Sequence, residues 1–190
     1  MVMQMEILGR IRGFAFNPAK EFAAAKKDTL MDAFKYYVLL LAVLAAILAI
    51  VMAVAVSVVE SMVELPLLGG FAFLLGAATF VDILIIGFFA ALYIIVWLHI
   101  WVYLFGGRKG LKETAKAVTY GATPCLVLGW IPVANVIIGP IWSVLVIING
   151  VMELQELSPG TAILAIIVAI LVPVIVIVAV LAALAVPMMP

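Results

Sequence analysis

The stretch Leu30–Val59, LMDAFKYYVLLLAVLAAILAIVMAVAVSVV, decides the fold class of this chain. An apolar run of about 20 residues or more can cross the hydrocarbon core of a bilayer as a helix. Of the 190 residues, 69% are hydrophobic and 11% are charged, which is more apolar side chain than a water-soluble domain can bury. The sequence therefore predicts an all-α integral membrane protein, and we expect Thr29-x-x-Asp32 to cap its first span.

A second apolar run, Leu65–Phe105, contains Asp82 as its one charged residue, with His99 counted as neutral. As a single helix this run would be about 60 Å long, twice the thickness of the hydrocarbon core. Glycines in its first part and a second capping pattern, Thr79-x-x-Asp82, indicate a break, so we expect the second span to begin near Phe80. Leu67–Ala78 is then an interfacial or re-entrant piece.

Two shorter apolar segments follow, and glycine and proline interrupt both of them. They either cross the membrane fully or form a hairpin that enters and leaves on one side, and the sequence leaves both possibilities open. Ser158-Pro159 predicts the start of the last span, because serine caps helices and proline is favoured at their first position. The predicted fold has about five spans in a membrane domain at residues 30–190, covering about 30–59, 80–105, 114–131, 135–152 and 159–186.

All ten basic residues lie either before the first span or just after the second. The positive-inside rule places such clusters in the cytoplasm, which requires an even number of crossings between them. We therefore expect a cytoplasmic N-terminus, an external C-terminus and a location in the cell membrane. Residues 1–29 form a cytoplasmic segment in which Ile7, Leu8, Ile11 and Phe14 share one face of an amphipathic helix. This helix lies on the membrane surface or, as an equal alternative, is a frayed terminus.

Few residues suggest chemistry. His99 and Asp82 are ionisable residues inside predicted spans, where such side chains are functional candidates. A neutral His99 hydrogen-bonded within an aromatic belt, and an Asp82 that caps a helix start, are the simpler interpretations. The single cysteine, Cys125, excludes an internal disulfide and a multi-cysteine metal site. Hydrolytic and phosphate-binding motifs are missing from the sequence, so we predict no catalytic, metal or cofactor site, no enzyme and no nucleic-acid partner.

The bases after the second span, and the irregular segments behind them, are the remaining candidates for a binding surface. Glu153 and Glu156 return to the same side of the membrane, so we expect salt bridges between them and this loop. The bases expected to contact a partner or an anionic lipid are Arg108, Lys109, Lys112 and Lys116. The residues expected to shape the hairpin, by close packing or by freeing carbonyls for a ligand, are Tyr120, Gly121, Pro124, Gly129, Pro132, Gly139 and Pro140.

Four features stand in order along the second half of the chain. They are Gly106-Gly107-Arg108-Lys109-Gly110, then Tyr120-Gly121-Ala122-Thr123-Pro124, then Gly129-Trp130-Ile131-Pro132, and last the run from Ile141-Trp142 through Gly150 to Glu153 that closes on Leu157-Ser158-Pro159-Gly160-Thr161-Ala162. Together they resemble the YIP family, the Ypt/Rab-interacting membrane proteins. Phe16-Asn17-Pro18 followed by Phe22 is similar to the start of the prokaryotic members.

The resemblance implies a five-span membrane fold with a cytosolic N-terminus. Eukaryotic members bind prenylated Rab GTPases in vesicle trafficking, but this sequence lacks their long N-terminal region and its Asp-Leu-Tyr-Gly-Pro element. The resemblance therefore implies a short archaeal or bacterial member, and the Rab partner does not carry over.

We expect a non-enzymatic scaffold or adaptor, related to membrane organisation or trafficking. It would bind the bilayer and another membrane or cytoplasmic protein, or self-associate. The alternatives are a small transporter or channel that uses the third and fourth helices, and an accessory subunit of a larger membrane complex.

Overall fold

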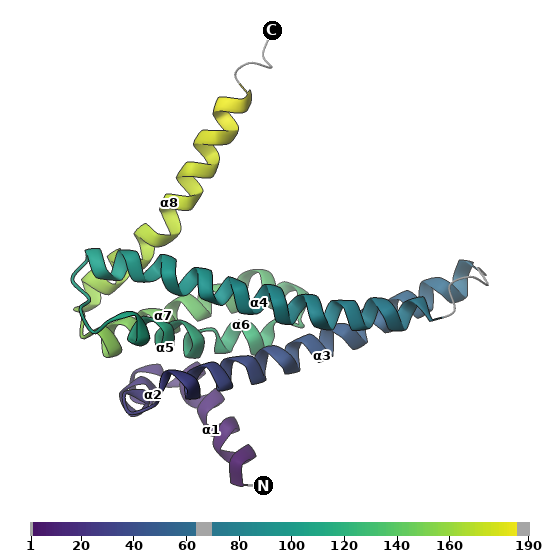
Figure 1. Ribbon diagram of the computed structural model, residues 1–190, viewed down its shortest axis with the longest axis horizontal. Coiled ribbons are helices and arrows are strands. Elements are labelled where there is room, and N and C mark those ends of the chain that lie inside the picture. Colours follow the sequence, from purple (N-terminus) through teal and green to yellow (C-terminus); the bar gives the residue numbers. More distant parts are fainter. Residues whose placement is uncertain (1, 64–69, 186–190) are drawn as a thin grey trace.

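The computed structural model describes residues 2–63 and 70–185, and the elements in these two ranges are helices. Two short helices come first, and the long helices α3 and α4 form an antiparallel hairpin (Figure 1). A shorter hairpin follows, with α5 and α6 in its first arm and a π-helical turn, η2, continued by α7 in its second. The elements are α1 (Val2–Phe16), α2 (Pro18–Ala25), α3 (Leu30–Val63), α4 (Phe71–Leu104), α5 (Leu111–Gly121), α6 (Thr123–Leu128), η2 (Ala134–Ile138), α7 (Gly139–Gln155) and α8 (Pro159–Ala185).

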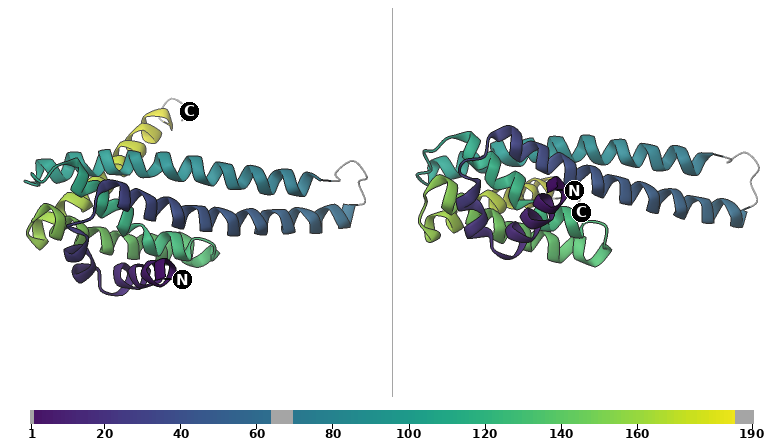
Figure 2. Two further views of the ribbon diagram at one scale, coloured as in Figure 1. Left: turned by 60° about the horizontal axis from the view of Figure 1, so that its bottom comes forward. Right: turned by 90° about the horizontal axis from the view of Figure 1, so that it is seen from below.

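The short hairpin packs beside one half of the long one. Helix α5 contacts α3, α4 and α7, while α1 and α2 pack on the short hairpin from another side. The other half of the α3–α4 hairpin projects beyond these helices, and α8 leaves the bundle at an angle (Figures 1 and 2). Large apolar side chains such as Ile50, Phe73 and Ile175 are exposed along these projecting parts, as expected of surfaces that face lipid.

Four helical stretches within the described residues are long and apolar enough to cross a membrane. They are Leu30–Met62, Phe71–Leu104, Ala134–Gln155 and Pro159–Leu184. The first, second, fourth and fifth predicted spans each fall on one of them. The third predicted span, at about 114–131, falls on none of them, so a crossing there stays a prediction, as do the membrane boundaries and the orientation of the chain.

The capping residues predicted for two of these helices are confirmed. At the start of α3, the Thr29 backbone N–H donates to Asp32 Oδ2 at 3.0 Å, and the Asp32 N–H donates to Thr29 Oγ1 at 3.2 Å. At the start of α8, the Thr161 N–H donates to Ser158 Oγ at 3.3 Å, with Pro159 at the first helical position. Short polar side chains thus satisfy backbone donors that a helix start leaves free.

The predicted helix start at Thr79–Asp82 is wrong. Helix α4 begins at Phe71 after Gly70, whose φ of 92° favours glycine, and Thr79 lies inside the helix with its hydroxyl donating to the Leu75 carbonyl at 2.8 Å. Asp82 is therefore also inside α4 and is not its cap. The described part of Leu67–Ala78 forms the first turns of α4 rather than a separate interfacial piece, and residues 67–69 lie outside the described residues.

Gly76 does not interrupt α4, because it serves packing instead. A Cβ atom at this position would lie 3.0 Å from both the Ala49 carbonyl oxygen and the Ala53 Cβ of α3. The glycine therefore lets the two long helices approach closely, as small residues do in membrane helices. At the far end of the hairpin, Glu60 accepts a hydrogen bond from the Ala72 N–H at 3.2 Å, which ties the end of α3 to the start of α4.

The third predicted segment is not one continuous helix. Helix α5 ends at Gly121, and α6 begins at Thr123 with Pro124 in its first turn, so each part is short. The returning arm packs tightly on this break: a Cβ at Gly121 would lie 2.3 Å from Ile147 Cγ1, and one at Gly139 would lie 3.2 Å from the Cys125 Cα. Gly121 and Gly139 thus allow the two arms to pack closely, and whether these arms cross the membrane fully or re-enter it stays a prediction.

Gly121→Val should destabilise the protein, because the added side chain overlaps α7 and neither helix backbone can move freely. We expect a loss of about 1–3 kcal/mol in the free energy of unfolding, measured by denaturing-detergent titration of the purified protein. Gly160→Val is the matched control, because a Cβ at Gly160 has no neighbouring atom within 4 Å. Equal losses in the two variants would contradict close packing at Gly121.

Candidate functional site

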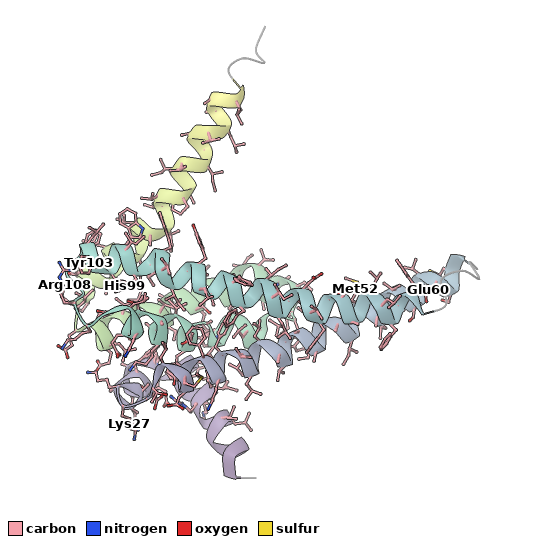
Figure 3. The ribbon with its side chains drawn as sticks, viewed as in Figure 1. Lys27, Met52, Glu60, His99, Tyr103 and Arg108 are labelled. Carbon is pink, nitrogen blue, oxygen red and sulfur yellow. The ribbon has the colours of Figure 1, made fainter. Side chains whose placement is uncertain are left out.

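The charged residues gather at one end of the bundle. Figure 3 shows Lys27, His99, Tyr103 and Arg108 at this end, while Glu60 lies at the far end of the long hairpin. The end of α2, the loop between α4 and α5, and the end of α7 meet here. Each of these segments contributes polar groups that would be costly to place in the membrane interior. This end is therefore where the protein can bind a polar partner.

Lys116 lies at the centre of this end and is 2% exposed. Its ammonium group donates to the backbone carbonyls of Ala25, Lys26 and Asp28 at 3.2–3.4 Å and pairs with Glu113 at 2.8 Å. The carbonyls at the end of a helix have no intrahelical partner and carry the negative end of its dipole. Lys116 therefore fastens the end of α2 to the middle of α5, and it is not part of an exposed basic surface.

A second cluster fixes α1 on the same helix. The Arg10 guanidinium pairs with Asp28 and lies 4.8 Å from the centre of the Tyr120 ring. The Tyr120 hydroxyl donates to Asp28 Oδ2 at 2.7 Å, and its ring stacks on Phe14 at 4.4 Å. Tyr120 and Phe14 are fully buried. The apolar face predicted for the N-terminal segment thus packs partly into the protein through Phe14, while Leu8 is 67% exposed.

A chain of hydrogen bonds connects α7, α5 and α4. The Lys109 N–H donates to Gln155 Oε1 at 3.0 Å, so Gln155 Nε2 is the group that donates to Thr114 Oγ1 at 2.9 Å. The Thr114 hydroxyl then has its own hydrogen free to donate to His99 Nδ1, 2.8 Å away. This arrangement favours a neutral His99 that carries its proton on Nε2.

The hydrogen bond predicted for His99 is therefore present, and the structure identifies its partner, which the sequence did not. The histidine bonds to Thr114 of α5, and the Tyr103 ring is tilted by 54° to the imidazole, with the two ring centres 6.4 Å apart. Asp82 borders an apolar cavity of about 330 Å³ between α3 and α4. Within residues 2–63 and 70–185, no three histidine, cysteine, aspartate or glutamate side chains lie close enough to hold a metal ion.

Two ion pairs surround the buried cluster. Lys109 pairs with Glu156 at 2.5 Å, and Lys26 pairs with Glu153 at 2.6 Å. The predicted link between the loop and the end of α7 is thus confirmed for Glu156, whereas Glu153 binds the end of α2 instead. A hydrogen bond from Lys109, and then its positive charge, holds the pKa of Glu156 below the ordinary value of 4.5. Correspondingly, the hydrogen bond with Glu153 raises the pKa of Lys26.

The four bases predicted as one binding surface therefore have different environments. Arg108 folds back over the Tyr103 ring at 3.9 Å and donates to the Tyr103 carbonyl. Lys109 is half exposed in its pair with Glu156, and Lys112 is exposed with no ion pair among the described residues. Only Lys116 is buried, because its position on α5 faces α2.

Sequence reasoning missed the partners of these bases. Asp28 lies in the turn before α3, and Gln155 lies at the end of α7, and neither belongs to a motif. Tyr120 stood in a recognisable Tyr-Gly motif, but its contacts with Arg10 and Phe14 join positions about 110 residues apart. Contacts between such distant positions leave no periodic signal in a single sequence.

Lys116→Met should lower the free energy of unfolding by about 2–4 kcal/mol, because it leaves the α2 carbonyls and Glu113 without their buried donor. Lys112→Met, one turn earlier on α5, is the matched control and should change stability little, because Lys112 is exposed. Unfolding by denaturing detergent compares the two. A Lys116 variant as stable as the Lys112 variant would contradict the fastening role.

The Lys109–Glu156 pair predicts a specific pH dependence. Because the pKa of Glu156 is lower in the folded protein, the pair stabilises the fold above the ordinary pKa of 4.5, and this contribution is lost as the pH falls through the folded pKa. Lys109→Gln should raise the pKa of Glu156 towards its ordinary value, as followed by carboxyl-carbon NMR. Lys20→Gln, which removes another exposed base, should leave it unchanged.

Comparison with known proteins supports the family suggested by the motifs. The family model described as the Yip1 domain matches residues 12–182, which span nearly the whole chain. No curated protein sequence and no solved structure matches this chain. The matched region begins inside α1 and includes the buried Lys116 and Tyr120, whereas Arg10 precedes it by two residues. By this match, the chain belongs to the Yip1-domain family of membrane proteins.

Proposed function

We propose that this protein is a non-enzymatic membrane scaffold or adaptor of the YIP type that binds a partner through its charged end. The observation that supports this most is the separation of polar and apolar surface. The ion pairs Lys26–Glu153 and Lys109–Glu156 lie at one end, whereas α3, α4 and α8 expose large apolar side chains over most of their length. A polar partner therefore has one surface on which it can form specific contacts.

The proposed orientation places the charged end in the cytoplasm of the cell, with the N-terminus, and the C-terminus outside. The bases gathered at this end support it through the positive-inside rule. In this proposal, Arg108, Lys109 and Lys112 provide the exposed contacts, and Lys116 acts from within by holding α2 and α5 together. Membership of the short archaeal or bacterial type stays a prediction.

Tyr120, Pro124 and the glycines of the hairpin support the surface from behind rather than contacting the partner. Tyr120 fixes α1, and the break at Pro124 allows α6 to turn against α7. This rigid support would keep the exposed bases in a fixed arrangement, which lowers the conformational cost of binding.

A transporter or channel built on the third and fourth helices has less support. Tyr120 and Thr123, two of the polar residues that would line its path, are fully buried, and the Thr123 hydroxyl bonds to Tyr36 at 3.0 Å. None of five cavities that border the described residues is lined by Tyr120, Thr123, Asn135 or Asn149. For the accessory-subunit alternative, no specific observation speaks in its favour.

The adaptor function predicts that a triple variant, Arg108→Gln, Lys109→Gln and Lys112→Gln, recovers less of its protein partner. Native pull-down from membranes, with quantitative mass spectrometry of the co-purified proteins, measures this recovery, and we expect a loss of about fivefold or more. The matched control, with Arg12, Lys20 and Lys27 each changed to Gln, alters the total charge equally.

Undiminished recovery in the triple variant, or an equal loss in the control, would contradict a binding role for this loop. If other membrane proteins co-purified with this protein at a fixed ratio, and neither triple variant changed that ratio, the accessory-subunit alternative would be supported instead.

A further inference from the structure

A cavity of about 790 Å³ lies where the start of α3, the middle of α4 and the start of α5 meet. Its volume is within the range of sites that hold small organic ligands. One wall is apolar and consists of Leu30, Met31, Phe34 and Phe88, whose two phenyl rings lie 6.1 Å apart. The opposite wall is charged, so the cavity is amphipathic.

The charges on this wall do not all cancel within the protein. Glu113 is paired with Lys116, whose ammonium is also surrounded by three carbonyls. Asp28 is held by Arg10 and by the Tyr120 hydroxyl. Lys112 lines the cavity, is exposed, and has no ion pair in the part of the chain that the structure describes. The cavity therefore offers one available positive charge, which complements an anion.

A second cavity of about 330 Å³ is lined by the same three helices and by α6. On α3 its lining begins at Tyr37, one turn beyond Phe34, and extends to Leu44, and on α5 and α6 it runs from Val118 to Leu126. From Phe34 to Leu44 the helix rises about 15 Å. This lining is apolar apart from Tyr37 and Asp82. Phe88 of the first cavity and Gly87 of the second are neighbours on α4, so the linings of the charged and the apolar cavity adjoin along the long hairpin.

We propose that these two cavities hold one phospholipid with an anionic headgroup, its phosphate at Lys112 and one acyl chain along α3 and α4. A lipid of the surrounding bilayer fits best, because the apolar wall continues to the outside of the protein: Met31 is 62% exposed and Phe88 is 37% exposed. The chain can therefore enter sideways from the membrane. The site shares Lys112 with the proposed partner surface but goes beyond the adaptor role, because it requires neither a protein partner nor Arg108 and Lys109.

The test uses the full-length protein, delipidated in a non-ionic detergent, and native mass spectrometry to measure bound phosphatidylglycerol against phosphatidylcholine. Lys112→Gln should weaken phosphatidylglycerol binding about fivefold, and Lys112→Arg should restore it. Lys27→Gln is the control, because Lys27 is exposed and does not line the cavity. An equal effect in both glutamine variants, or equal binding of phosphatidylcholine, would overturn the proposal.

A second pair of variants tests the acyl-chain cavity. Ala90→Trp should fill it and reduce phosphatidylglycerol binding, whereas Ala78→Trp on the projecting part of α4 should have no effect. If inorganic phosphate at the same concentration as the lipid displaced phosphatidylglycerol, the site would be one for free anions and the lipid assignment would be overturned. Unchanged phosphatidylglycerol binding by the Ala90 variant would overturn it as well. Partner recovery measured in parallel keeps the two proposals separate, since a lost lipid with a retained partner leaves the adaptor role intact.

Discussion

The arrangement of this protein depends on a positive charge that has been removed from solvent. The ammonium of Lys116 is stable in its buried position only because the carboxylate of Glu113 and three backbone carbonyls, at the end of α2 and in the turn that follows it, surround it. An unpaired charge in such a position would cost several kcal/mol, so the end of α2 has one well-defined place on α5. Two further side chains of α5 add connections of their own, Thr114 to α4 and α7 and Tyr120 to α1 and the turn before α3. A single eleven-residue helix thereby fixes most of its neighbours.

Because the polar contacts are concentrated around α5, the two ends of the molecule have different surfaces. The projecting half of the α3–α4 hairpin and the outer part of α8 expose large apolar side chains, and their role is to lie in lipid. Around α5, ion pairs and hydrogen bonds fix direction and register, which van der Waals packing between apolar helices does only weakly. A rigid polar end on an apolar body suits a protein that presents a surface inside a membrane, as we propose. The same arrangement suits the proposed phospholipid, whose headgroup would lie at the polar end and whose acyl chain would lie along the apolar helices.

The comparison of sequence and structure shows which physical signals a single sequence carries. Local signals were reliable. Thr29 and Asp32 cap α3, and Ser158 and Pro159 start α8, as predicted. The long apolar runs also form long helices. Ambiguous local signals failed where packing decided the outcome. Gly76 and Thr79 could mark a break or a close helix contact, and only the position of Ala49 and Ala53 on α3 distinguishes the two. The burial of Lys116 could not be predicted either, because the three carbonyls that accept its hydrogen bonds are backbone groups about 90 positions earlier in the chain.

The separation between Lys116 and its partners also orders the events of biosynthesis. The acceptor carbonyl of Ala25 precedes the lysine by 91 positions, and Trp142, whose indole donates to the Ala15 carbonyl, follows its acceptor by 127. At a synthesis rate of about 5–20 residues per second, α1 and α2 leave the ribosome roughly 5–18 seconds before α5 is complete. During that interval both α3 and α4 can insert, while the helix that holds the end of α2 through Lys116 has not yet been made. The segment that is made first is therefore among the last to find its place.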